Sequence, residues 1–319
     1  MTSALSSSEF LFDSTPDLTF YFRSAFSMSD PAQLLRDLQP TKEFFVGIDS
    51  DGCVFDSMEI KHKECFTPMF IKHFGLQPVS KYAREVWDFV NLYSKTRGIN
   101  RFPALSNALD FLAKRPEVIA RQVQVPSPDP IDLWISRETK LSNATLKQEV
   151  ERGNLSLENV LAWSNAVNAA IEDIVKGVPP FPLVRECLAK LNQSADAMVI
   201  SQTPTEALER EWAEHDLARH VRLIAGQELG TKTEHLKFAA SGKYPKQKVL
   251  MIGDAPGDFK AAKSNNALFY PICPGKEEAS WQRLNEEALD IFFAGDYAGD
   301  YEAALVSEFN ACLPDKPAW

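Results

Sequence analysis

Two aspartates that directly follow an apolar run are the residues of this chain best suited to chemistry. Asp49 and Asp51 come after Phe44–Ile48, and Gly52 follows them. A continuous apolar run is typical of a strand buried in a parallel sheet, and ligands of such sheets bind at the carboxyl ends of the strands. Two carboxylates this close repel each other unless a cation or a proton intervenes. The pair therefore indicates either a metal site or a division into nucleophile and acid, and the alternative is an aspartate-rich turn.

Three later segments place further polar groups where strands are expected to end. Ser201 and Gln202 follow one apolar run, and the Ser201 hydroxyl with nearby backbone N–H groups could hold phosphoryl oxygens at a helix start. Lys232 precedes a predicted helix, and Asp254 and Asp258 form a Gly-Asp-x-x-x-Asp sequence after another apolar run. Carboxylate oxygens are the ligands that Mg²⁺ prefers. Taken singly, these are also an ordinary loop serine, a solvated lysine, a turn aspartate and a helix cap.

The order of predicted elements indicates an α/β fold with a Rossmann-like parallel sheet and helices on both faces. The stretch between the first two strands reads as mostly helical and exceeds 100 residues, which is too long for a crossover, so it is interpreted as a separate helical cap. The predicted division is an N-terminal extension at 1–40, partly disordered, an α/β core at 41–60 and 178–319, and a cap at 61–177. Residues 1–27 are expected to be dispensable.

Composition narrows the classes of partner. The net charge of -10 argues against general nucleic-acid binding, which needs a basic surface. Five scattered cysteines without a C-x-x-C pair are typical of reduced thiols in the cytoplasm. The sequence has neither a secretory signal pattern nor an apolar run long enough to span a membrane. We therefore expect a cytoplasmic protein that acts on a small molecule, and the oligomeric state stays open.

The motifs taken together resemble the haloacid dehalogenase superfamily. The order Asp-x-Asp-Gly, Ser, Lys and Gly-Asp-x-x-x-Asp runs through residues 41–60 and 178–290. The position of the insert between the first two motifs is similar to that in phosphoglycolate phosphatases and β-phosphoglucomutases. The resemblance implies a Mg²⁺-dependent phosphatase that hydrolyses a small phosphate monoester through an aspartyl phosphate.

The resemblance also implies roles for single residues. Asp49 would be the nucleophile, and Asp51 would protonate the leaving oxygen and then deprotonate water. Asp49, the backbone carbonyl of Asp51 and Asp254 would hold Mg²⁺, with Asp258 as a ligand or directly behind one. Ser201, with Gln202 beside it, and Lys232 would bind the phosphoryl oxygens.

Several alternatives stay open. Asp51 disfavours a dehalogenase, because family dehalogenases lack an acid at this position. A phosphonatase would need a cap lysine as a Schiff base, and Lys61, Lys63 and Lys95 are available. A phosphomutase or a non-catalytic binding protein on this fold are the other possibilities.

The polar segment 95–101 is the candidate for substrate recognition. Arg97 and Arg101 could bind a second anionic group of the substrate, although a solvated loop is the alternative. If they do, Arg97→Ala should impair activity on the true substrate and spare p-nitrophenyl phosphate. The sequence does not identify the leaving group.

Overall fold

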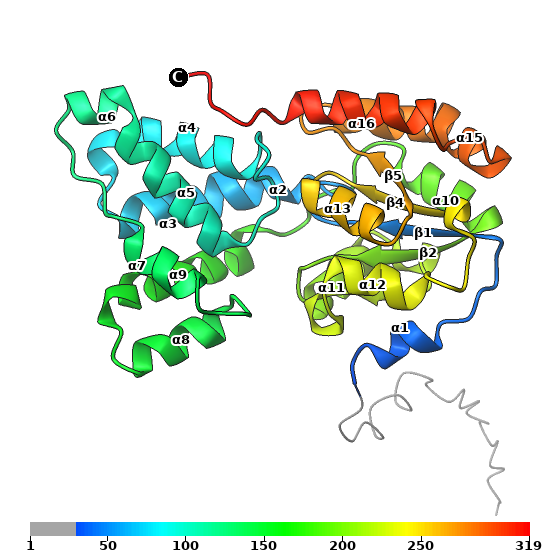
Figure 1. Cartoon of the computed structure of the whole chain (residues 1–319), viewed down its shortest axis with the longest axis horizontal. Coiled ribbons are helices and arrows are strands. Elements are labelled where there is room, and N and C mark those ends of the chain that lie inside the picture. Colours follow the sequence, from blue (N-terminus) through cyan, green and yellow to red (C-terminus); the bar gives the residue numbers. More distant parts are fainter. Residues whose placement is uncertain (1–29) are drawn as a thin grey trace, which may run out of the picture.

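A parallel sheet forms the centre of the computed structural model, which describes residues 30–319 (Figure 1). The expectation for residues 1–27 therefore lies outside the described residues. The strand order is β3-β2-β1-β4-β5, and every pairing is parallel. The strands are β1 (Phe44–Ile48), β2 (Ala195–Ile200), β3 (Ile224–Ala225), β4 (Val249–Gly253) and β5 (Leu268–Pro271). Because β1 is central and pairs with both β2 and β4, the carboxyl ends of these three strands meet at one edge.

Helices cover both faces of the sheet, which confirms the predicted fold class. Alternate residues of β1 point to opposite faces: Val46 packs with α10, α14 and α15, and Phe45 packs with α1, α12, α13 and α16. All five residues of β1 are buried, as expected for an internal strand. The helices of this α/β unit are α1 (Gln33–Asp37), α10 (Val184–Ser194), α11 (Thr205–Glu214), α12 (Lys232–Ala239), α13 (Pro256–Ser264), α14 (Glu277–Arg283), α15 (Leu289–Ala294) and α16 (Asp300–Cys312), with short turns η5 (Ala218–His220), η6 (Gln227–Leu229), η7 (Lys246–Lys248) and η8 (Leu284–Ala288).

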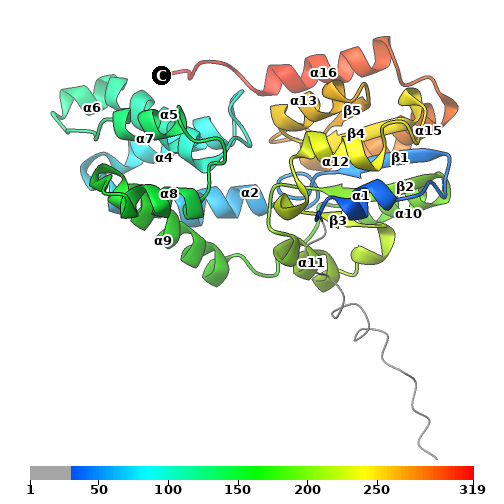
Figure 2. The same ribbon diagram turned by 60° about the horizontal axis from the view of Figure 1, so that its bottom comes forward.

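Most of the segment between β1 and β2, from α2 to α9, folds into a helical unit with an apolar core of its own. Trp87 and Trp163 lie at its centre, edge to face, with ring centroids 5.8 Å apart. The unit lies beside the α/β unit, on the side where β1 runs into α2 (Figures 1 and 2). Its elements are α2 (Ser57–Ile60), η2 (Lys61–Phe66), α3 (Thr67–His73), η3 (Gln77–Val79), α4 (Ser80–Asn91), α5 (Arg101–Lys114), α6 (Pro116–Ala120), α7 (Asp129–Ile135), α8 (Asn143–Glu151), η4 (Leu155–Leu157) and α9 (Glu158–Ile174).

Both ends of the described chain pack against other parts of the structure. Leu35 of α1 is buried in the core of the α/β unit, and Lys243 Nζ donates to three carbonyl oxygens around the end of α1, including that of Leu35 at 2.9 Å. Residues 33–38 therefore pack with the sheet, although the sequence placed them in an extension. At the other end, residues 313–319 run from α16 to the helical unit (Figure 1), where the Trp319 ring lies 5.4 Å from that of Phe89.

Helix starts differ from the predicted ones in two places that bear on the site. Asp258, for which a helix cap was the alternative role, lies within the first turn of α13, which begins at Pro256. The helix that Lys232 was expected to precede begins at Lys232 itself, because Thr231 and Glu234 form a capping box there. Across the described residues, we find no helix that is both long and apolar enough to cross a membrane.

Candidate active site

The register of the sheet brings the predicted site residues to one edge. Ile48 of β1 pairs with Val199 of β2 and with Ile252 of β4. Asp49 and Asp254 therefore follow neighbouring strands, and the Asp49 N–H donates to the Ile252 carbonyl at 3.0 Å. Ser201 follows β2 in the same way. Chain segments about 200 residues apart in sequence thus meet because parallel strands align their carboxyl ends.

Three buried carboxylates form the centre of this site. Asp49, Asp254 and Asp258 each offer an oxygen atom within 4.8 Å of the others. Lys232 Nζ lies between two of them, 2.6 Å from Asp49 Oδ2 and 2.6 Å from Asp258 Oδ1. Asp258 is also fixed by the N–H of Ala255, which donates to its Oδ2 at 3.0 Å at the start of α13. Capping of α12 and α13 thus positions both Lys232 and Asp258.

The charges of this cluster suit a bound cation. Within residues 30–319, the three carboxylates pair with two cationic side chains, Lys232 and Arg97. Burial raises the pKa of Asp49 well above its usual range although Lys232 opposes the shift, and burial likewise raises the pKa of Asp254 to about 6. Burial would lower the pKa of Lys232, but Asp258 and Asp49 outweigh it and raise it. Negative charge is therefore in excess at this position.

One carboxylate oxygen of the cluster has no partner among the described residues: Oδ1 of Asp254, which is buried. Buried carboxylate oxygens almost always accept hydrogen bonds or bind metal ions. An all-oxygen set of this kind fits a hard divalent cation. Asp49, Asp254 and Asp258 are therefore the residues that could hold one.

Asp51 belongs to a different set of contacts. Its Oδ1 accepts from Ser57 Oγ and from Lys61 Nζ, and its Oδ2 accepts from Thr203 Oγ1 at 2.6 Å. Burial alone would raise the pKa of Asp51, but the charge of Lys61 and the three donors outweigh it and lower the pKa to about 2. The two aspartates that follow β1 thus lie in separate environments.

The residue between them is anchored by α11. Ser50 Oγ accepts from Trp212 Nε1 at 3.0 Å and donates to Glu211 Oε2 at 3.4 Å. Burial, helped by the charge of Asp51, raises the pKa of Glu211 to about 7. Glu211 is thus a further carboxyl group near Asp51.

The side chains of Ser201 and Gln202, which follow β2, make hydrogen bonds to the backbone. Ser201 is buried, and its Oγ accepts from the Thr203 N–H at 3.2 Å, so this N–H is already engaged. The exposed Gln202 side chain donates to the carbonyl of Gly230 at 3.0 Å, on the loop before α12. Ser201 and Gln202 thus lie at the strand end predicted for them, with Lys232 beginning the neighbouring helix.

The two arginines expected to bind substrate already have partners within the protein. Arg97 is only 3% exposed, and its Nε and NH2 donate to Asp254 Oδ2 at 2.8 and 2.6 Å. Arg101 NH1 donates to Ser164 Oγ at 3.0 Å and to Asn168 Oδ1 at 2.6 Å on α9. In this arrangement Arg97 acts on a carboxylate of the cluster, so the expected sparing of p-nitrophenyl phosphate in Arg97→Ala does not follow.

Sequence reasoning missed the side chains that surround Asp51. Ser57, Glu211 and the Thr203 hydroxyl were not considered, and Lys61 was considered only as an imine-forming residue. One signal was present: Ser57 and Lys61 are four residues apart at the start of a helix, which puts them on one face. Thr203 and Glu211 come from a distant segment and gave no comparable signal.

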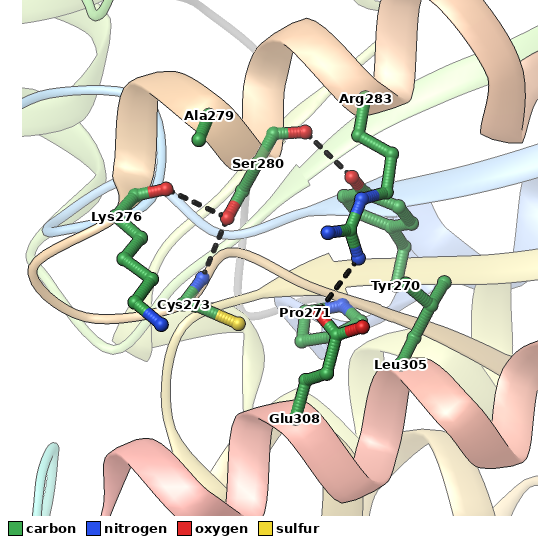
Figure 3. A pocket seen from close by; sticks show the side chains of 9 residues that line it. All are labelled: Tyr270, Pro271, Cys273, Lys276, Ala279, Ser280, Arg283, Leu305 and Glu308. Carbon is green, nitrogen blue, oxygen red and sulfur yellow. Dashed lines mark hydrogen bonds and ion pairs between the residues drawn. The ribbon is translucent and has the colours of Figure 1, made fainter.

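The cavity nearest the end of β5 is not part of this site. It has a volume of about 40 Å³, which accommodates a few waters but no metabolite. Several of its polar groups already pair with each other, as Arg283 does with Glu308 at 2.8 Å (Figure 3). The residues lining it are Tyr270, Pro271, Cys273, Lys276, Ala279, Ser280, Arg283, Leu305 and Glu308.

Comparisons with known proteins point to one family. Residues 120–270 match the model of the haloacid dehalogenase-like hydrolases, a stretch that includes Ser201, Lys232, Asp254 and Asp258. No curated protein sequence matches the chain.

Similar solved structures include a haloacid dehalogenase-like family hydrolase from Streptococcus pneumoniae, at 15% identity and a TM-score of 0.41 over 78% of this chain and 93% of that one. They also include a predicted phosphoglycolate phosphatase from Haemophilus somnus, at 15% identity and a TM-score of 0.45 over 73% and 86% of the two chains. The family model covers the strand ends that carry Ser201 and Asp254, and it agrees with the resemblance drawn from the motifs: residues 120–270 are similar to haloacid dehalogenase-like hydrolases.

Proposed function

We propose that this chain is a Mg²⁺-dependent phosphatase that hydrolyses a small phosphate monoester through an aspartyl phosphate on Asp49. The observation that carries the proposal is the separation of the two aspartates after β1. Asp49 lies in a carboxylate cluster that fits a cation, with Lys232 beside it, whereas Asp51 lies among hydroxyl and ammonium donors outside that cluster. This difference suits a nucleophile and a proton carrier.

The first step transfers the phosphoryl group to the protein. A carboxylate oxygen of Asp49 attacks phosphorus, the bond from phosphorus to the leaving oxygen breaks, and Asp51 donates a proton to that oxygen. Lys232 and the Ser201 hydroxyl bind the phosphoryl oxygens, and Lys232 offsets the charge of Asp49. Mg²⁺ held by Asp49, Asp254, Asp258 and the Asp51 carbonyl would reduce the repulsion between the carboxylate and the phosphate.

The second step returns Asp49 to its original form. Asp51 takes a proton from water, the water oxygen attacks phosphorus, and the bond between phosphorus and Asp49 breaks to release inorganic phosphate. For the first step Asp51 must carry a proton, while Lys61, Ser57 and Thr203 stabilise its ionised form. We infer that Asp51 becomes the acid only after the substrate's leaving group has displaced Lys61.

The helical unit is the proposed cap, because it sends two cationic side chains to the carboxylates of the α/β unit. Lys61 contacts Asp51, and Arg97 contacts Asp254. We therefore keep the proposed division into an α/β core and a cap at residues 61–177. The five cysteines are all free thiols, which suits the proposed cytoplasmic location.

The three lysines that a phosphonatase could use all have partners within the protein. A Schiff-base lysine reacts as a free amine. Lys61 pairs with Asp51, Lys63 pairs with Glu59, and Lys95 Nζ donates to Asn310 Oδ1. Each candidate amine is thus engaged with an acceptor.

A panel of phosphorylated metabolites tests the proposal. The purified protein should release inorganic phosphate from at least one monoester when Mg²⁺ is present and should lose this activity in EDTA. Asp49→Asn should be inactive, whereas Asp56→Asn, which changes an exposed aspartate after the same strand, should keep the activity. A strict requirement for a bisphosphate activator would instead identify a mutase, and full activity of Asp49→Asn would contradict the proposed nucleophile.

A further inference from the structure

One arginine of the helical unit holds a carboxylate of the candidate cation site. Arg97 lies between α4 and α5, and its guanidinium makes three contacts. Nε and NH2 donate to Asp254 Oδ2 at 2.8 and 2.6 Å, and NH1 donates to the carbonyl of Leu92 at 2.9 Å. With 3% of its surface exposed, Arg97 has little freedom to adopt another conformation.

The side chain of Asp254 is held by a residue of the helical unit, whereas those of Asp49 and Asp258 are held within the α/β unit. Arg97 provides the only hydrogen bonds to the Asp254 side chain among the described residues, all to Oδ2, and Oδ1 accepts none. Asp49 and Asp258 are instead held from within the α/β unit, by Lys232 and, for Asp258, by the N–H of Ala255. Asp254 is therefore the one carboxylate of the cluster whose orientation is set from the helical unit.

Two glycines make the close approach of this arginine possible. A Cβ atom on Gly52 would lie 2.6 Å from Arg97 NH2 and 2.6 Å from Asp254 Oδ2. A Cβ atom on Gly98 would lie 2.8 Å from the Cβ of Ala255, at the start of α13. A side chain at either glycine would therefore collide with groups at the contact between Arg97 and Asp254 or with the start of α13. The absence of a Cβ atom at both positions lets the loop that carries Arg97 pack closely against the α/β unit.

We propose that Arg97 is a positioning residue for the cation site. It fixes Asp254 through Oδ2 and leaves Oδ1 free to bind the cation. Because Arg97 belongs to the helical unit, the site is complete only while this unit is docked on the α/β unit, so cation binding and docking favour each other. This inference rests on the proposed cation site, and it adds a link between that site and the cap.

A purely electrostatic role would give the opposite result on mutation. A guanidinium beside the site repels a cation, so its removal would strengthen binding if charge alone mattered. Hydrogen-bond partners behind a metal ligand orient that ligand, and their loss typically weakens metal binding about 10–100-fold. Arg97→Lys separates the two effects, because it keeps the charge and loses the forked geometry. Arg97→Met removes both.

Calorimetric titration of the metal-free full chain with Mg²⁺ tests the inference. We expect Arg97→Lys and Arg97→Met to raise the Kd for Mg²⁺ about 10-fold or more. Arg84→Met, which removes an exposed arginine of α4, should bind Mg²⁺ like the parent. In activity assays, the Mg²⁺ concentration for half-maximal rate should rise in Arg97→Lys while kcat at saturating Mg²⁺ is largely recovered, which a loss of folded protein would not produce.

The outcomes separate this inference from the proposed function. Unchanged or tighter Mg²⁺ binding in the two Arg97 variants would overturn the positioning role and leave the metal site intact. Failure of the parent itself to bind Mg²⁺ would overturn the proposed metal site, and the role of Arg97 with it.

Discussion

Replacing Lys232 with methionine should make the stability of the protein depend strongly on Mg²⁺. Lys232 Nζ lies 2.6 Å from both Asp49 Oδ2 and Asp258 Oδ1. The Lys232 side chain is 17% exposed, and the two carboxylates are 6% and 0% exposed. Without this ammonium, two buried carboxylates lose their shared counter-ion, and water can replace it only in part.

The expected cost follows from the burial of this pair. Removing one partner of a buried ion pair typically lowers the free energy of unfolding by about 3–5 kcal/mol. We expect a loss in this range for Lys232→Met in EDTA. Mg²⁺ bound by the same carboxylates would neutralise them, so the loss should be smaller at saturating Mg²⁺. Hydrolysis should also fall, because a phosphate-binding cation is missing.

Urea denaturation followed by tryptophan fluorescence, in EDTA and in excess Mg²⁺, measures these effects. Lys237→Met is the matched control, since Lys237 is an exposed lysine on the same helix and should change the free energy of unfolding by no more than about 0.5 kcal/mol. A Lys232→Met protein as stable as the parent in EDTA, with no added benefit from Mg²⁺, would refute the reasoning.

Three further predictions concern the surroundings of the site. Asp51→Asn should lower kcat about 10²–10⁴-fold for an alkyl phosphate and less for p-nitrophenyl phosphate, whose leaving group needs little protonation; steady-state rates on both substrates check this. Burial lowers the pKa of His62 from 6.5 to about 3, and its Nδ1 accepts a hydrogen bond from Trp87 Nε1 at 3.1 Å. Between these two pH values the unfolded chain binds more protons than the folded one. The free energy of unfolding therefore falls as the pH drops. Unfolding curves between pH 4 and 7 should show a decline smaller by up to about 3 kcal/mol in His62→Gln, and an equal decline in both proteins would contradict this assignment. Gly52→Ala places a side chain at a φ of +75° and 2.6 Å from Asp254 Oδ2, so its free energy of unfolding should fall by at least about 1–3 kcal/mol, and a thermal unfolding temperature equal to the parent's would argue against the close contact.

The part of the site that the sequence predicted is the part built on strand ends. Asp49, Ser201 and Asp254 follow apolar runs, and a parallel sheet brings the ends of such runs together whatever the loops do. Lys232 and Asp258 were also identified, because a helix start beside a strand end limits where their side chains can go. Regular backbone hydrogen bonding sets the positions of these residues, and the sequence pattern encodes that regularity.

The contacts between the helical unit and the α/β unit could not be predicted in this way. Arg97 and Asp254 are 157 residues apart, and their contact depends on how the loop between α4 and α5 docks, which no periodicity encodes. The same limit applies to Lys61, which was considered only as a Schiff-base lysine and in the structure contacts Asp51. These side chains were recognised as basic, but the carboxylates that they contact are set by tertiary packing.

The most direct test of the central claim is the detection of a phosphoryl group on Asp49 during turnover. The protein is mixed with a substrate found in the metabolite panel, quenched in acid within milliseconds, digested, and examined by mass spectrometry. We predict a phosphorylated peptide that contains Asp49, present in the parent, absent in Asp49→Asn, and longer-lived in Asp51→Asn, in which the attacking water lacks its base. Hydrolysis at the parent rate by Asp49→Asn, or a phosphoryl group on another residue, would contradict the account.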